Sequence, residues 1–243
     1  MKAAPIPRRI FQFAHDPAAV PPLCRDSMSS VSEFAGRYAY EYRLLTLDDL
    51  PSIMGTYDSD APLHLMPRCR NFGDLSDVLR NLLIDRHGGW WLDWDMHVVH
   101  PRQLDDWLNQ NSDFEWTGVI DDTNDIVANG LQGGVAHNKI NLGFLEWVAS
   151  NLHGQDQHAS FFLAGVHEFT RYLKSVGFVD RRLRLVPMSH TLQAFYSEIK
   201  GSPEGVSVEP SPANPQPVFH HWVHGWEENS FDVPAWVKRN LTG

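Results

Sequence analysis

Along the chain, the spacing of hydrophobic residues alternates between the pattern of strands and the pattern of helices. The chain is therefore predicted to fold into strands that alternate with helices. Short apolar runs predict strands at residues 8–13, 40–45, 90–99, 113–120 and 183–188. Helical spacing predicts a helix from Ser29 toward Tyr40, a short helix at 46–54 broken at Pro51, and helices at 73–89, 141–152 and 167–176. Such alternation around one core predicts an α/β fold, with a mixed, mostly parallel sheet flanked by helices.

The helix predicted at 73–89 has the clearest pattern. At about 100° per residue, its apolar side chains fall on one face and its polar ones on the other; they are Leu75, Val78, Leu79, Leu82 and Leu83 against Asp77, Arg80 and Asn81. Gly88 and Gly89 are suited to end the helix. The strand at 90–99 follows directly, so a helix, a tight turn and a buried strand succeed one another.

Two aspartates interrupt that apolar strand. Asp93 and Asp95 are spaced i, i+2, which places them on one face of a strand, with Trp94 on the other. Ligands of α/β sheets bind at the carboxyl ends of strands. Paired carboxylates without nearby cysteines suit a hard divalent ion such as Mg²⁺ or Mn²⁺, which could stabilise a leaving diphosphate. The alternative is a pair of solvated turn acids.

Composition narrows the class of protein. A chain of 243 residues fits one core, so we expect a single domain over 1–243. A long loop rich in Pro, Ser and Gly is expected at 201–217. The formal net charge of -10, with "DRRLRL" as the main basic run, argues against a nucleic-acid partner. No stretch approaches the roughly 18 apolar residues of a transmembrane segment.

The expected location is the cytoplasm. The segment "MKAAPIPRRIFQF" lacks the apolar run of a secretory signal. Cys24 and Cys69 are the two cysteines, and reduced thiols are the simpler interpretation for a chain of this size. Export by another route and a single disulfide stay open.

The segment "LSDVLRNLLIDRHGGWWLDWDM" carries a family resemblance. It resembles the donor-site segment of the DXD-containing, sugar-binding glycosyltransferases of the GT-A fold, family 32, in which Ser-Asp, an Arg, Gly-Gly and Leu-Asp-x-Asp follow in this order. The opening "IPRRIFQF" and the late "HHWVHGW" look like the family's terminal motifs. Ala14 or His15 stands where a nucleobase-stacking tryptophan is common, and Gly225 replaces a serine. Residues 100–215 match only faintly.

The resemblance implies roles for individual residues. Asp95 would bind the metal directly, and Asp93 would contact it through water or bind ribose and sugar hydroxyls. The set implied for donor binding is Asp77, Arg80, Gly89, Asp93 and Trp226. Apart from the resemblance, Asn129 and Gln132 stand beside a Gly-Gly pair after a predicted strand and could reach the donor sugar or the acceptor. His221 or His220 would help to hold the metal or the diphosphate. The donor-binding core would span about 1–150, and the rest about 151–243.

Structural interpretations stand beside these roles. Asp77 and Arg80, at i, i+3, also fit a surface ion pair on a solvated face. The histidines of "HHWVH" also fit packing of a C-terminal strand, and by spacing alone His220, His221 and His224 fit a zinc cluster.

The resulting hypothesis is a metal-dependent enzyme using Mn²⁺ or Mg²⁺, with Asp93 and Asp95 as its catalytic residues. It would transfer a hexose from a UDP- or GDP-sugar to a hydroxyl of a carbohydrate, lipid-linked or protein acceptor, with retention of configuration. Two rivals are a non-catalytic sugar-binding protein with a structural metal and a haloacid-dehalogenase-like phosphatase. In the phosphatase motif a threonine stands where this chain has His97.

Overall fold

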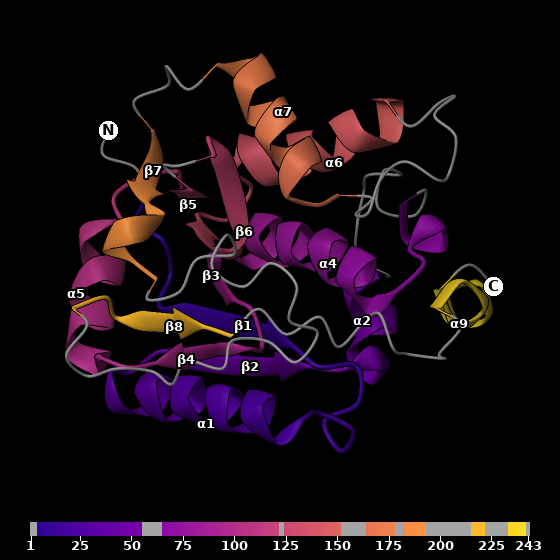
Figure 1. Ribbon diagram of the computed structural model, residues 1–243. Helices are drawn as coiled ribbons and strands as arrows, with labels where there is room; N and C mark the ends of the chain where they lie inside the picture. The colour runs from indigo at the N-terminus through magenta and orange to yellow at the C-terminus, as the bar shows by residue number, and fades with distance from the viewer. Residues whose placement is uncertain are drawn as a thin grey trace.

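A six-stranded sheet forms the centre of the molecule (Figure 1). The computed structural model describes residues 4–54, 65–121, 124–151, 164–177, 182–192, 215–221 and 233–241. The sheet order is β2-β1-β3-β6-β5-β7, with bounds β1 Arg9–Phe13, β2 Glu41–Leu45, β3 Gly89–Leu92, β5 Trp116–Asp121, β6 Ile126–Gly134 and β7 Leu183–Pro187. Within this sheet, β6 runs antiparallel to both of its neighbours and the other pairs are parallel. The sheet is therefore mixed and mostly parallel, as predicted.

Helices cover both faces of the sheet (Figure 1). Those described are α1 Pro22–Arg37, α2 Leu50–Met54, α4 Phe72–His87, α5 Pro101–Gln110, α6 Lys139–Asn151, α7 Val166–Val176 and α9 Val233–Leu241, with 3₁₀ turns at Leu47–Asp49, Met66–Arg68 and Met188–His190. A separate antiparallel pair joins β4 (Met96–Val98) to β8 (Val218–His220). The predicted α/β class with flanking helices is confirmed.

Alternation along β3 divides the core between the two faces. Trp91 belongs to the apolar cluster beneath α4, α6 and α7, whereas Trp90 belongs to the cluster beneath α1, α5 and β4. Both indoles are 1% exposed. The strand is buried on both sides, which explains its almost continuous apolar sequence.

Helix α4 is held at both ends by the residues its sequence supplies. At its start, the Asn71 side chain accepts a hydrogen bond of 2.8 Å from the Asp74 amide. At its end, Gly88 has φ 61°, and its amide donates to the Ile84 carbonyl. A Cβ at Gly88 would lie 2.7 Å from the Ala136 nitrogen, so glycine fits this tight turn into β3.

The strand order reverses beside β1. The chain leaves β1 through α1 to form β2 on one side, and later arrives through α4 to form β3 on the other. Helices α1 and α4 lie on opposite faces of the sheet. In open α/β sheets such a reversal of strand order marks the place where ligands bind, outside the carboxyl ends of the strands. Asp93 and Asp95 follow the carboxyl end of β3 at this place.

The long strand predicted at 90–99 is wrong, because the chain turns after Leu92. The Met96 amide donates to the Asp93 carbonyl at 3.0 Å, which closes a turn, and β4 then pairs with β8 instead of continuing the central sheet. Asp93 and Asp95 therefore occupy a turn between two sheets rather than one face of a strand.

Other boundaries also differ from the prediction. Helix α1 begins at Pro22, before the predicted start, because a proline at the first helical position lacks only an amide that needs no partner there. The short helix predicted at 46–54 is divided one residue before the predicted break at Pro51. A 3₁₀ turn at Leu47–Asp49 gives way to α2 at Leu50, and Pro51 lies in the first turn of α2, where a proline is tolerated. Strand β6 and helices α5 and α9 were not predicted.

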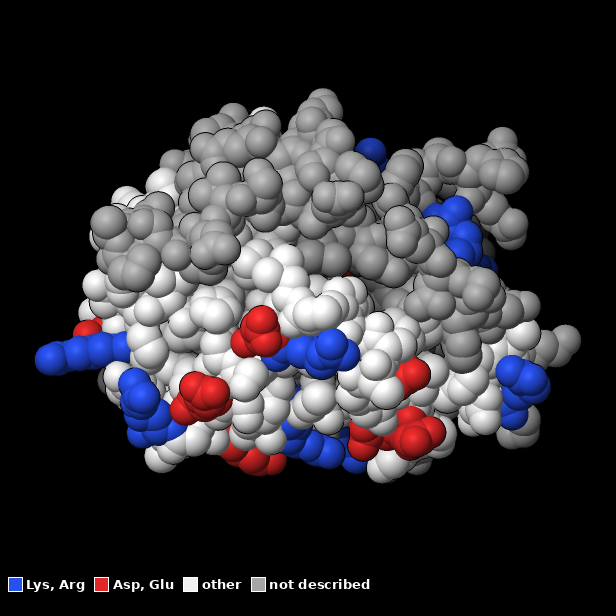
Figure 2. Space-filling model, turned by 60° about the horizontal axis from the view of Figure 1, so that its bottom comes forward, with Lys and Arg blue, Asp and Glu red and all other residues white. Residues whose placement is uncertain are grey.

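The surface carries charges of both signs. On the face in Figure 2, acidic and basic side chains are interspersed over the described residues. Among the described helices, none combines the length and the apolar character needed to cross a membrane.

Candidate metal and donor site

The turn after β3 is fixed by hydrogen bonds that involve three other strands. The Asp93 amide donates to the Gly130 carbonyl of β6 at 2.9 Å. The Asp93 carbonyl accepts from the Gln12 side chain of β1 at 3.0 Å. Tyr42 of β2 in turn donates to Gln12 Oε1 at 2.9 Å. Strands β1, β2 and β6 therefore determine where the first aspartate lies.

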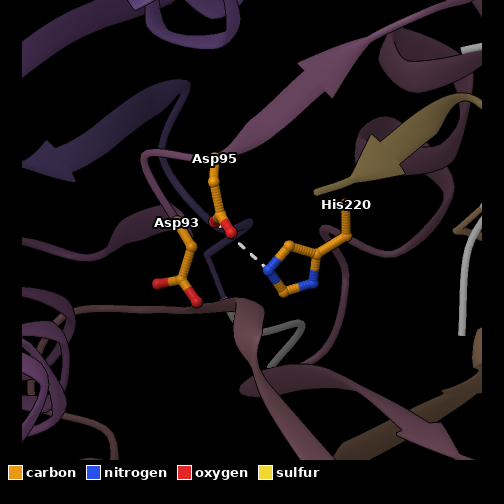
Figure 3. A group of neighbouring side chains, drawn as sticks. All are labelled: Asp93, Asp95 and His220. Carbon is orange, nitrogen blue, oxygen red and sulfur yellow. Dashed lines mark ion pairs between the residues drawn. The ribbon is translucent and has the colours of Figure 1, made fainter. Parts of the chain in front are cut away.

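Three potential metal ligands converge at this turn (Figure 3). Ligand atoms of Asp93, Asp95 and His220 all lie within 4.8 Å of one another. His220 arrives on β8, and its Nε2 lies 3.2 Å from Asp95 Oδ1. Asp95 is 3% exposed and His220 5% exposed, so the paired groups are withdrawn from solvent.

These residues fit a divalent ion. Ligand atoms around one ion at roughly 2.0–2.4 Å are separated by less than about 5 Å, and the observed atoms satisfy this. Two carboxylates suit Mg²⁺ or Mn²⁺, while a neutral imidazole nitrogen favours a transition metal over Ca²⁺. The predicted acid pair therefore gains a third donor from a distant part of the chain.

The histidine that reaches the acids is His220, whereas the metal set implied by the resemblance favoured His221. Neighbouring residues of a strand point to opposite sides. The His221 ring lies beside Phe219 and His97, with centroids at 4.8 and 6.3 Å. Its backbone amide donates to the Asp95 carbonyl at 3.1 Å. Burial lowers the pKa of His221 to about 4, and His97 and His220 act in the same direction against Asp95, so the ring is neutral.

A buried ion-pair network adjoins the acids. Arg80 Nη2 lies 3.0 Å from Asp77 Oδ1 and 3.2 Å from Asp93 Oδ1, and so bridges helix α4 to the turn. Asn129 of β6 donates to Asp77 Oδ1 at 2.7 Å. Asp77 and Arg80 are each 4% exposed. The alternative of a solvated surface ion pair is therefore excluded: the polar face of α4 covers the site.

Burial changes the acidity of Asp77. Its pKa is raised from 3.8 to about 7, chiefly because burial disfavours the charged carboxylate. Asp93 and Asp74 raise it further, while Arg80 and the hydrogen bond from Asn129 oppose the shift. Asp77 can therefore exist in either protonation state near neutral pH.

Trp91 contacts the site through its indole nitrogen. Nε1 donates to Asp93 Oδ1 at 2.7 Å, and the Arg80 guanidinium lies 5.3 Å from the Trp91 ring centroid. On the other side of the carboxylate, a Cβ at Gly130 would lie 2.6 Å from Asp93 Oδ2. The missing side chain of Gly130 thus leaves room for the second oxygen of Asp93.

Several buried polar atoms near the acids have no partner among the described residues. They include Nη1 of Arg80 and Nε2 of Gln132. Gln132 pairs with Trp91 across β6 and β3, and its Oε1 accepts from Trp116 at 3.1 Å. Buried donors are usually satisfied, so these atoms suit a polar, acceptor-rich ligand.

Aromatic side chains flank the turn at the end of β1. The His15 ring stacks on Phe72 with centroids 3.8 Å apart and planes at 8°. Trp94, between the two acids, lies 6.1 Å from the His15 ring. An aromatic patch of His15, Phe72 and Trp94 therefore borders the acidic turn.

Of the implied donor set, Gly89 lies elsewhere, and Trp226 is not among the described residues. Gly89 lies at the amino end of β3, where its φ is 124° and a Cβ would lie 2.8 Å from the Arg9 carbonyl oxygen, so it serves close packing there. Trp226, like His224 and most of the loop at 201–217, lies outside the described residues.

Gln12, Trp91 and Gly130 are contacts of Asp93 that sequence reasoning did not assign. Gln12 was detectable as a lone polar residue in the apolar run "RIFQF". Trp91 precedes Asp93 by two positions, a spacing that places both side chains on one side of a strand. Gly130 gave no signal because its strand was not predicted.

Comparisons with known proteins return similarities among solved structures. No family model matches the chain, and no curated protein matches it. One similar structure is described as "PaToxG Glycosyltransferase", with 15% identity, a TM-score of 0.48, and coverage of 71% of this chain and 69% of that one. Another is a glycosyltransferase involved in glycosylation of the major capsid of PBCV-1, with 11% identity, a TM-score of 0.49, and coverage of 88% and 93%.

A third is the glycosyltransferase GlyE of Streptococcus pneumoniae TIGR4, with 9% identity and a TM-score of 0.43. The alignment covers 97% of this chain and 60% of GlyE. Because each TM-score is below 0.5, these similarities carry no argument about activity, which has to come from the site residues.

Proposed function

We propose that the protein is a metal-dependent glycosyltransferase that moves a hexose from a UDP- or GDP-sugar to an acceptor hydroxyl. The observation that carries the proposal is the convergence of Asp93, Asp95 and His220 at the turn after β3. The sequence "LSDVLRNLLIDRHGGWWLDWDM" adds support, since its Asp77 and Arg80 are adjacent to that group.

Asp95, His220 and Asp93 would hold Mn²⁺ or Mg²⁺, and the imidazole favours Mn²⁺. When bound, such an ion supplies positive charge that stabilises a departing diphosphate. Asp93 and Asp95 come from the turn between β3 and β4, and His220 comes from β8, so the fold itself brings the three side chains together. A preorganised site of this kind lowers the cost of charge stabilisation in the reaction.

Arg80, Asp77 and Gln132 would bind the hexose. The buried Arg80 Nη1 and Gln132 Nε2 are donors in need of acceptors, and sugar hydroxyl oxygens are acceptors. With a pKa of about 7, the Asp77 carboxyl group can accept a hydrogen bond from a sugar hydroxyl when it is ionised, and it can donate a hydrogen bond when it is protonated. Gly89 takes no part in this proposal.

The His15, Phe72 and Trp94 patch would contact the nucleobase, because flat rings pack well against flat rings. The acceptor would be a carbohydrate, a lipid-linked sugar or a protein. The proposal includes retention of configuration, which the family resemblance implies. Among the residues at the site, catalysis would then consist mainly of positioning and charge stabilisation.

A donor panel tests this function. Purified protein is incubated with UDP- and GDP-sugars in Mn²⁺, Mg²⁺ or EDTA, and released nucleoside diphosphate is measured. We expect slow hydrolysis of one donor that EDTA removes and that Asp95→Asn reduces by at least about 100-fold, since removing a direct metal ligand removes its charge stabilisation. Asp125→Asn is the matched control, because Asp125 pairs with Lys174 at an exposed site.

An Asp95→Asn variant that keeps full, EDTA-insensitive activity would contradict the proposal. If no donor is hydrolysed, calorimetric titration with nucleotide sugars decides. Sugar binding without nucleotide binding would favour the sugar-binding rival. An aspartyl-phosphate mimic trapped on Asp93 would favour the phosphatase.

A further inference from the structure

Among the described residues, the contacts that restrain the Asp93 side chain all fall on one oxygen, Oδ1. Trp91 Nε1 donates to Oδ1 at 2.7 Å, and Arg80 Nη2 lies 3.2 Å from the same atom. Trp91 is 1% exposed, whereas the Asp93 side chain is 21% exposed. A partly exposed carboxylate can rotate about its terminal torsion. A short hydrogen bond from the buried, rigid Trp91 ring opposes that rotation of the Asp93 carboxylate.

The backbone of Asp93 is already fixed by other residues. Its amide donates to Gly130 and its carbonyl accepts from Gln12 and from the Met96 amide. Rotation of the side chain is therefore the main freedom left to Asp93. Trp91 and Arg80 act on that freedom and leave Oδ2 on the side of Gly130, where there is no side chain to block it.

We propose that Trp91 is a positioning residue whose indole N–H holds Oδ1 of Asp93, so that Oδ2 is the oxygen presented to the metal ion. The inference rests on the proposed function, since it specifies how one member of the metal group is aimed. Trp91 touches neither metal nor donor in this scheme. Groups that orient metal ligands in this way commonly contribute 10- to 100-fold, roughly, to metal affinity.

Trp90 supplies a matched control on the same strand. It is as buried as Trp91 but faces the opposite cluster, where it packs on Trp107 with centroids 5.7 Å apart. Replacing either tryptophan with phenylalanine removes part of a buried ring. Only at position 91 does the change also remove the hydrogen bond to Asp93 Oδ1.

The experiment compares Mn²⁺ binding by wild type, Trp91→Phe and Trp90→Phe. Each is titrated with Mn²⁺ in the presence of UDP or GDP by calorimetry and by the electron paramagnetic resonance signal of free Mn²⁺, and melting temperatures are recorded. We expect Trp91→Phe to weaken Mn²⁺ binding by about 10-fold or more. Trp90→Phe should change the Mn²⁺ affinity by less than about threefold. Both variants can lower the melting temperature, because each loses buried ring area, but the loss at position 90 does not alter the contacts of Asp93.

Equal Mn²⁺ affinities in wild type and Trp91→Phe would overturn the inference and leave the proposed function intact. Absence of Mn²⁺ binding by wild type would overturn the proposed function, and the inference with it. If Trp91→Phe does not fold, β-(3-benzothienyl)alanine at position 91 keeps the ring shape and replaces the N–H with sulfur. The same 10-fold loss is expected of that variant, and an unchanged affinity would again overturn the inference.

Discussion

The two ends of β3 belong to one short segment, residues 88–95, but they differ in what they contribute. At the amino end, Gly88 and Gly89 allow backbone to approach backbone, with Arg9 and Ala136 as neighbours. At the carboxyl end, Asp93 is surrounded by donors from three other elements. The glycines at the amino end of β3 allow close backbone packing, and the residues at its carboxyl end carry charge. Substitutions at the two ends should therefore have different effects on stability and on ligand binding.

The largest effect on the free energy of unfolding is expected from Arg80→Met, near the carboxyl end of β3. The change leaves Asp77 and Asp93 without their buried counter-charge. Removing one partner of a buried pair costs about 3–5 kcal/mol of the free energy of unfolding. Urea denaturation in EDTA measures this loss, and nucleotide-sugar titration of the folded fraction should show loss of donor binding.

Arg171→Met is the control, because Arg171 and Glu168 have the same i, i+3 spacing on α7 but the arginine is 64% exposed. Such exposed pairs contribute about 0–1 kcal/mol. Equal losses in the two variants would mean that the Arg80 network is energetically an ordinary surface pair.

An effect of comparable size, again at the carboxyl end of β3, is expected from pH. Between its unfolded value of 3.8 and its folded pKa of about 7, Asp77 holds a proton in the folded protein that the unfolded chain has released. Stability relative to Asp77→Asn should therefore fall as the pH rises from about 4 to 7 and recover on acidification, by roughly 1.4 kcal/mol per unit of pKa difference. Unfolding free energies of both proteins in EDTA across this range give the difference. A difference that rises with pH would mean that Arg80 outweighs burial.

The smallest effect on stability is expected from Gly89→Ala, at the amino end of β3. An alanine there needs a φ of 124° and meets the Arg9 carbonyl oxygen at 2.8 Å. The strain should cost about 1–3 kcal/mol of stability and leave Mn²⁺ affinity unchanged, because no ligand moves. Gly36→Ala, in the exposed part of α1 with open space around it, should be neutral or stabilising. Weakened donor binding with normal stability would return Gly89 to the donor site.

Local pattern predicted most of the central elements. Period and apolar runs found β1, β2, β5, β7 and the helices α4, α6 and α7, because each buries one face or both. Strand β6 escaped because "IVANGLQGG" contains three glycines and two amides, which are unfavourable in strands taken alone. Their reason is tertiary: Gly133 lies against the Trp90 ring and Gly130 against Asp93.

The candidate site was predictable only in part. Asp77, Arg80 and the two acids lie close together in the sequence, and their grouping followed from a motif. The choice between His220 and His221 depended on which side of β8 faces the turn, a single-residue register that sequence does not reveal. The burial of the polar face of α4 was equally hidden, since amphipathic helices usually turn that face to water.

The pairing of β4 with β8 sets the order in which the site can be completed during synthesis. Asp93 and Asp95 leave the ribosome long before His220, and a chain translated vectorially folds its early parts first. The nascent chain thus has an acidic turn without its histidine, and closing the loop to β8 is the late, entropically costly step. His220 therefore joins Asp93 and Asp95 only after synthesis has reached β8.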